Sequence, residues 1–166
     1  MSNLGSTSGL KAGDAKGLRL AAAVASFNKV YTSRLLASAN ARLRALGGGL
    51  ERVEWVPGAL ELPLAAQWLA GRGYDAVLAL GCVIRGDTSH YDLVCQGSVL
   101  GLQRASLDSG VPVAFGVITT ENKAQALARC SGGPMDAGRH AGECAVAMAR
   151  LKQRLAGGTR PRQKGK

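Results

Sequence analysis

Residues 75–92, with the sequence DAVLALGCVIRGDTSHYD, decide the fold of this chain. Residues 76–80 form an unbroken apolar run, and Val83 and Ile84 extend it. A run of strand length without polar alternation is typical of a strand that is buried on both faces of a parallel sheet. The polar group at residues 85–90 contains three residue types that favour helix N-caps, and helical spacing begins at Leu93. The stretch therefore predicts a buried strand that leads directly into a helix.

The junction between this strand and helix is also a candidate functional site. Gly86 lets a ligand approach the backbone closely, and a helix N-terminus offers free N–H groups to an anion. His90, in the first turn, has an imidazole, the side chain that most readily accepts and releases protons in enzymes. The alternative interpretation is a capped helix after a strand, with a histidine on the surface.

Strand and helix patterns alternate along the rest of the chain. Strands are expected at residues 18–25, 50–56, 75–84 and 111–118. Helices are expected at residues 31–46, 60–70, 91–107 and 119–130, and a last helix follows a Gly-rich loop at residues 131–142. Apolar stripes are expected at Leu93, Leu100 and Leu107 in the third helix and at Cys144, Met148, Leu151 and Leu155 in the last. The alternation predicts an α/β protein: a flavodoxin-like three-layer α/β/α sandwich with a four-stranded parallel sheet.

The length of 166 residues and the composition divide the chain into three parts. Residues 1–17 have few apolar side chains and are expected to form a disordered arm, residues 18–156 a single domain, and residues 157–166 a basic tail. The formal net charge is +10, but seven of the 21 basic residues lie from Arg150 onward, where there is no acidic residue. Fourteen basic residues then face eleven acidic ones, so the domain itself has no nucleic-acid-binding signature.

The four cysteines are widely spaced and form no C-x-x-C motif, so we expect buried thiols and no metal site. The N-terminus lacks the apolar block of a signal peptide, and no apolar run approaches the length of a membrane span. These features predict a cytoplasmic protein without a membrane partner.

In a parallel sheet with right-handed crossovers, the carboxyl ends of all strands lie at one edge, where ligands bind. Polar or small residues follow each expected strand: residues 26–28, 57–61, 85–90 and 118–120. Pro57 and Gly58 leave main chain open to a flat ligand, with Glu61 as an acceptor for hydroxyls; a proline turn that opens the next helix is the equally good alternative. This convergence favours a binding site over isolated turns.

Four segments resemble one family in the same order: residues 25–28 (ASFN), 56–63 (VPGALELP), 81–90 (GCVIRGDTSH) and 115–122 (FGVITTEN). The family is 6,7-dimethyl-8-ribityllumazine synthase, and the resemblance covers about residues 18–155. It implies the condensation of 5-amino-6-(D-ribitylamino)uracil with 3,4-dihydroxy-2-butanone 4-phosphate, the penultimate step of riboflavin biosynthesis, with no cofactor. The alternative is a non-catalytic flavin- or lumazine-binding protein with the same pocket.

The resemblance also implies roles for individual residues. His90 is the expected catalytic proton carrier. The expected binding residues for the pyrimidine and its ribityl chain are Phe27, Asn28, Gly58, Ala59, Leu60, Glu61, Cys82, Val83, Ile84 and Phe115. The expected phosphate-binding residues are Gly86, Asp87, Thr88, Arg129 and His140.

In the family the site lies between subunits of a ring, which implies that Phe115 and Arg129 come from a neighbouring copy. Residues 138–143 (GRHAGE) depart from the family's usual Asn-Lys-Gly, and His140 either takes the place of the lysine or is a solvated loop residue. The loop before the last helix is longer than in shell-forming members, so a homopentamer is favoured over an icosahedral 60-mer.

Overall fold

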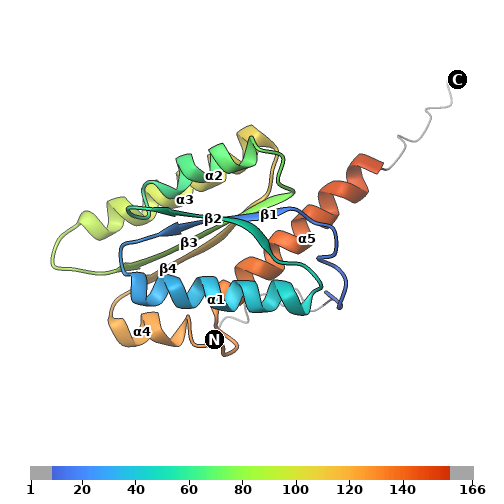
Figure 1. Ribbon diagram of the computed structural model, residues 1–166. Helices are drawn as coiled ribbons and strands as arrows, with labels where there is room; N and C mark the ends of the chain where they lie inside the picture. The colour runs from blue at the N-terminus through green and yellow to red at the C-terminus, as the bar shows by residue number, and fades with distance from the viewer. Residues whose placement is uncertain (1–8, 158–166) are drawn as a thin grey trace, which may run out of the picture.

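The computed structural model describes residues 9–157. Its elements are, in order, β1 (Leu20–Ala25), α1 (Lys29–Ala45), β2 (Leu50–Val56), α2 (Leu62–Ala70), β3 (Ala76–Ile84), α3 (His90–Ser109), β4 (Val113–Thr120), α4 (Lys123–Ala128) and α5 (Ala137–Gly157). The four strands form one parallel sheet in the order β2-β1-β3-β4. Helices α2 and α3 cover one face, and α1 and α5 cover the other (Figure 1). The predicted flavodoxin-like α/β/α sandwich is confirmed.

Alternate residues of β1 belong to different layers of the core, which explains its unbroken apolar sequence. Leu20, Ala22 and Val24 pack in the cluster on the α1 and α5 side of the sheet, and the alanines between them pack in the cluster on the α2 and α3 side. Every residue of β1 is buried, as are residues 76–82 of β3. Both central strands therefore lie between two helical layers, as the apolar runs predicted.

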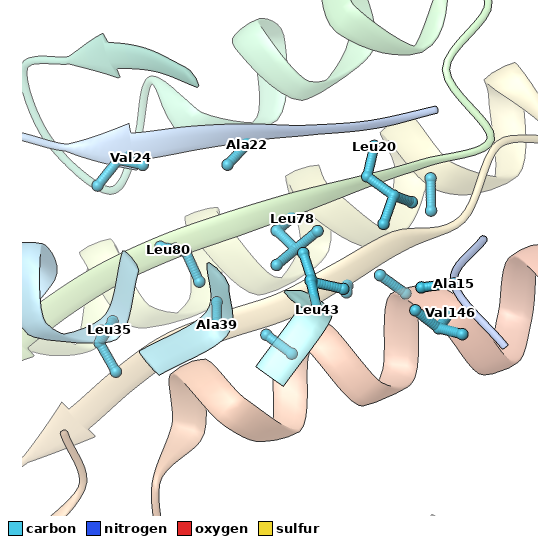
Figure 2. Packing of buried hydrophobic residues seen from close by; sticks show 14 of the residues in the cluster. Ala15, Leu20, Ala22, Val24, Leu35, Ala39, Leu43, Leu78, Leu80 and Val146 are labelled. Atoms are coloured by element: carbon cyan, nitrogen blue, oxygen red, sulfur yellow. The ribbon is translucent and has the colours of Figure 1, made fainter. Parts of the chain in front are cut away.

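Helix α1 contributes a narrow apolar stripe to the core on its side of the sheet. Leu35, Ala39 and Leu43 are fully buried, at a spacing of four residues that places them on one face of a helix. Figure 2 shows these side chains in the same cluster as Leu78 and Leu80 of β3. With a low aromatic content, the core is filled mostly by Leu, Ala and Val.

Part of the predicted disordered arm, residues 9–17, is ordered and packed against the domain. The Ala15 side chain is fully buried, and the backbone N–H groups of Gly13 and Ala15 donate to the Leu46 carbonyl at 3.0 and 2.8 Å. Arg150 of α5 donates to the carbonyls of Asp14 and Lys16. Main-chain hydrogen bonds, which composition does not reveal, hold this segment in place. Residues 1–8, and 158–166 of the predicted tail, lie outside the described residues.

The predicted loop at residues 131–142 is shorter, because α5 begins at Ala137. Gly138 and Gly142, which suggest a loop in the sequence, lie inside this helix and are buried. A Cβ at Gly138 would overlap the Leu35 carbonyl of α1, and one at Gly142 would lie 3.2 Å from the Ala39 carbonyl. The glycines therefore allow α5 to cross α1 at close range.

The apolar stripes expected in α3 and α5 do not face the core. Leu93, Leu100 and Leu107 are 65%, 65% and 76% exposed, whereas the buried residues of α3 are Ser98, Leu102 and Ala105. In α5, Cys144, Met148 and Leu155 are exposed, and mainly small residues line the buried face. Hydrophobic spacing therefore identified both helices correctly, but it did not reveal that most residues of the two stripes are exposed. No described helix is both long and apolar enough to span a membrane.

We predict that Gly138→Ala lowers the free energy of unfolding by about 1–3 kcal/mol, because the added methyl group must push α5 away from α1. Urea denaturation followed by circular dichroism measures this change. Gly157→Ala, in the same helix with nothing within 4 Å of the added carbon, is the matched control and should change stability by less than about 0.5 kcal/mol. Equal effects of the two substitutions would contradict the close helix crossing.

Candidate active site

A cavity of about 430 Å³ lies at the carboxyl ends of the strands. Its lining comes from the last residues of β1 and β3, from the segments after β1, β2 and β3, and from the first turns of α3. These residues are Ala25, Phe27, Pro57, Gly58, Ala59, Leu60, Glu61, Cys82, Val83, Ile84, Gly86, Thr88, His90, Tyr91 and Val94. In the sheet, β2 lies on one side of β1, whereas β3 and β4 lie on its other side. The connections after β1 and after β2 therefore run in opposite directions across the sheet, and α/β sheets bind ligands at such a switch point.

The Phe27 ring forms an open apolar surface at the cavity. It is 71% exposed, although its backbone is fixed: Ser26 N donates to the Val56 carbonyl at 2.7 Å, and Phe27 N donates to the Pro57 carbonyl at 3.0 Å. An exposed but anchored aromatic ring can stack on a flat heterocycle without reorganising the backbone.

The segment after β2 places the Glu61 carboxylate beside the main chain of Gly58 and Ala59, which have little or no side chain. Gly58 N donates to Glu61 Oε2 at 2.8 Å, so the carboxylate is oriented before any ligand binds. Ala59 lies between them and leaves space for a ligand. A carboxylate held in this way still has further acceptor positions for hydroxyl donors.

His90 is the first residue of α3 and lines the cavity together with Gly86 and Thr88. The N–H of His90 donates to the Thr88 hydroxyl at 3.4 Å, and the Ser89 side chain makes no capping hydrogen bond. The N-terminus of α3 therefore provides a partial positive charge at the cavity beside an imidazole.

Arg85 lies close to this helix start, but its charge is neutralised. Its guanidinium donates to Glu121 at 2.7 Å and to both carboxylate oxygens of Asp92 at 3.3 and 3.4 Å. It also lies 4.0 Å from the centroid of the Tyr91 ring. Two carboxylates and an aromatic face thus hold Arg85 in place.

Five of the residues expected at the site do not line this cavity. They are Asn28, Asp87, Phe115, Arg129 and His140. The Asn28 amide instead donates to the Cys82 carbonyl at 3.0 Å, and Asp87 is exposed in the loop before α3.

Phe115 lies in the edge strand β4 and is 45% exposed, and Arg129 ends α4. His140 belongs to α5 and not to a loop: its Nε2 lies 2.8 Å from the Pro134 carbonyl, and its Nδ1 lies 3.7 Å from Glu143.

Comparison with known proteins identifies the family of this chain. The family model described as 6,7-dimethyl-8-ribityllumazine synthase matches residues 17–153. Proteins of that name from Salinibacter ruber and Streptomyces avermitilis are 44% identical over 144 residues (85% of this chain and 92% of the relative) and 46% identical over 134 residues (80% and 83%). One from Coxiella burnetii is 42% identical over 140 residues, 82% of this chain and 93% of the relative. The chain belongs to the 6,7-dimethyl-8-ribityllumazine synthase family.

Three cavity residues of this lumazine synthase family member were not anticipated from the sequence: Ala25, Tyr91 and Val94. Tyr91 follows His90, and Val94 lies four residues beyond it in α3, where a helix brings it to the same face. Helical spacing from His90 was therefore the signal that could have found Val94.

The thiol and phenol of the cavity are held in their neutral forms. Burial raises the pKa of the Cys82 thiol to about 12, with a smaller contribution from Cys130. Burial also raises the pKa of the Tyr91 phenol. Neither group is prepared to act as a base near neutral pH. Within residues 9–157 no three His, Cys, Asp or Glu side chains cluster in a way that could hold a metal ion.

We predict that Cys82 in the folded protein is alkylated about a thousandfold more slowly at pH 8 than in urea, because a pKa of about 12 leaves little thiolate. Since the pKa is raised, the rate should increase about tenfold per pH unit until the pH approaches 12. Mass spectrometry of the Cys82 peptide after timed iodoacetamide treatment measures both effects. Rapid alkylation of folded protein would contradict the buried, protonated thiol.

Proposed function

We propose that this chain catalyses the condensation of 5-amino-6-(D-ribitylamino)uracil with 3,4-dihydroxy-2-butanone 4-phosphate. The products are 6,7-dimethyl-8-ribityllumazine, phosphate and water, in the penultimate step of riboflavin biosynthesis. The observation that best supports this proposal is that three groups meet in one cavity. They are the exposed Phe27 ring (the aromatic shelf), the oriented Glu61 carboxylate and His90 at the N-terminus of α3.

Each part of the cavity fits one part of the reaction. Phe27 stacks on the pyrimidine, with Val83 and Ile84 as the opposite wall, and Glu61 accepts hydrogen bonds from ribityl hydroxyls. His90 moves protons during imine formation, phosphate elimination and ring closure. Phosphate binds at the Gly86–Thr88 backbone before α3, where N–H groups and the helix dipole favour an anion.

A phosphate group also needs a cationic partner, and no Lys or Arg of the described chain lines this cavity. Arg85, the arginine nearest in sequence, is paired with two carboxylates. A cation from another copy solves this problem, and we assign that role to Arg129, together with Phe115 as a second aromatic wall. His140 remains a weaker candidate for the same anion, because its ring is within reach of groups of its own chain.

The exposed stripe on α3 supports assembly into a ring. Leu93, Leu100 and Leu107 are spaced by seven residues, the period at which parallel helices pack along a common seam. A head-to-tail contact that donates residues to the next site either closes into a ring or propagates as an open filament, and only a ring gives every copy a complete site in a particle of fixed size. We therefore propose a homopentamer in which α3 helices of successive copies are in contact.

The alternative, a carrier that binds flavin or lumazine without turnover, requires the aromatic shelf but no proton carrier at the phosphate end. His90 at that position favours the enzyme. All four cysteines lie in the described residues as free thiols, which supports a reducing compartment such as the cytoplasm. That the reaction needs no metal or organic cofactor remains a prediction.

We predict that the purified protein forms the lumazine from both substrates in the presence of EDTA, followed by the product's absorbance. His90→Ala should lower kcat by about 10²–10⁴-fold, because one positioned proton carrier contributes that much. Binding of the pyrimidine alone should stay within about twofold of wild type, since the ring stacks on Phe27. Product that forms only after metal is restored, or a fully active His90→Ala variant, would refute the mechanism.

We predict that light scattering after size exclusion gives a mass near 86 kDa, five times the 17.1 kDa chain. Leu100→Lys should yield smaller species with little activity, because a charge in the α3 seam prevents the shared site from forming. Leu155→Lys, the same change at an exposed leucine at the end of α5, is the matched control and should keep both the mass and the activity. A particle near 1 MDa would indicate a shell of about 60 subunits, and an active monomer would exclude the shared site.

A further inference from the structure

Asn28, which follows Phe27, has an unusual backbone conformation. Within residues 9–157 it is the one non-glycine residue with a positive φ, at φ 59° and ψ 39° in the left-handed region. Residues with a Cβ avoid this region, although asparagine tolerates it better than most. Such strain persists only where neighbouring structure enforces it, and it is concentrated at functional sites. The surroundings of Asn28 must therefore hold it in this conformation.

The side chain of Asn28 is used in an unusual way for its position. Asn28 precedes α1 as its N-cap, where an asparagine normally accepts a hydrogen bond from an N–H of its own helix. Here it makes no such bond, and its Nδ2 donates to the Cys82 carbonyl of β3 at 3.0 Å. The side chain therefore joins two parts of the protein 54 residues apart in sequence.

This hydrogen bond links the β1 side of the sheet to β3 beyond the last paired residues of these two strands. The pairing of β1 with β3 ends at Val24 and Leu80. Cys82 lies two residues further along β3, where β1 no longer supplies an N–H donor. The Asn28 amide supplies that donor, so the left-handed backbone and the long-range bond belong to one arrangement.

Phe27 is thereby fixed from two sides. Its own N–H donates to the Pro57 carbonyl in the segment after β2, and the next residue is bonded to Cys82 in β3. Cys82 and Val83 line the same cavity as the Phe27 ring, so the Asn28 bond sets the separation between this shelf and the β3 wall. A flat ring bound between them depends on that separation, since stacking weakens when the gap is wrong.

We propose that Asn28 is a positioning residue that holds the Phe27 shelf at the distance from β3 that the pyrimidine substrate requires. The inference rests on the proposed function for the identity of that substrate. Asn28 acts without touching the substrate: it does not line the cavity, and its amide donates to the protein backbone.

Two substitutions separate the amide bond from the backbone conformation. Asn28→Asp keeps the size of the side chain but replaces the donor with a carboxylate facing a carbonyl oxygen. Asn28→Gly relieves the left-handed strain and removes the bond. Both should raise the KM for the pyrimidine roughly two- to tenfold, the effect of one lost hydrogen bond, with the KM for the phosphate-bearing substrate unchanged.

Asn40→Asp is the matched control for this experiment. Asn40 lies on the same helix, and its Oδ1 accepts from Leu50 N, a role that a carboxylate oxygen can keep. Its KM values should equal those of wild type. An unchanged pyrimidine KM in both Asn28 variants, or an equal rise in both substrates' KM values, would overturn the inference.

A double-mutant cycle tests whether Asn28 acts through the ring. In a Phe27→Ala background, Asn28→Asp should have no further effect on pyrimidine binding, because there is no shelf left to position. Independent, multiplicative effects would mean that Asn28 contacts the substrate or acts elsewhere, and would overturn the proposal. Calorimetric titration with the pyrimidine alone gives the same comparison without turnover. An inactive wild-type protein that still binds the pyrimidine with this coupling would refute the condensation reaction but not the role of Asn28.

Discussion

Burial of β3 on both faces is the constraint on which the rest of the structure depends. Its backbone pairs with β1 on one side and β4 on the other, and residues 76–82 are covered by helices on both faces of the sheet. A strand in this position accepts only apolar side chains and must pair all its backbone groups. Burial becomes partial at Val83 and Ile84, so β3 first emerges from the core at the wall of the cavity. The same burial that stabilises the domain thus fixes where the site lies.

The fold could be predicted from the sequence because burial on two faces leaves an unmistakable apolar run. The convergence of Phe27, Glu61 and His90 could be predicted as well, since parallel strands bring their carboxyl ends to one edge. These inferences needed only the order of the elements. They did not depend on how any pair of helices packs.

What the sequence left open or got wrong has a common cause: periodicity and residue type report that a residue is apolar, small or polar, but not what it contacts. Leu93, Leu100 and Leu107 repeat regularly, yet they lie on the surface of α3. Gly138 suggested a loop, although it permits close contact between α5 and α1. Asn28 is a typical N-cap residue, and nothing in the local sequence indicates that its amide bonds to a carbonyl on β3. Each case depends on a partner that is distant in the chain or absent from it.

The cavity of a single copy is chemically incomplete, and this links assembly to catalysis in the proposed reaction. It offers an apolar shelf, a carboxylate and a histidine, but its nearby arginine is already paired. Correct placement of two bound reactants can supply about 7–11 kcal/mol of a barrier. Proton transfer by one residue supplies about 3–5 kcal/mol. Positioning as a whole therefore contributes more to the rate than proton transfer by His90, but this contribution is shared among the groups that hold the shelf, the carboxylate and the phosphate. The hydrogen bonds from Asn28 to Cys82 and from Gly58 to Glu61 contribute to this positioning. So does the contact between copies, because a phosphate without its cation would leave the second reactant free to move.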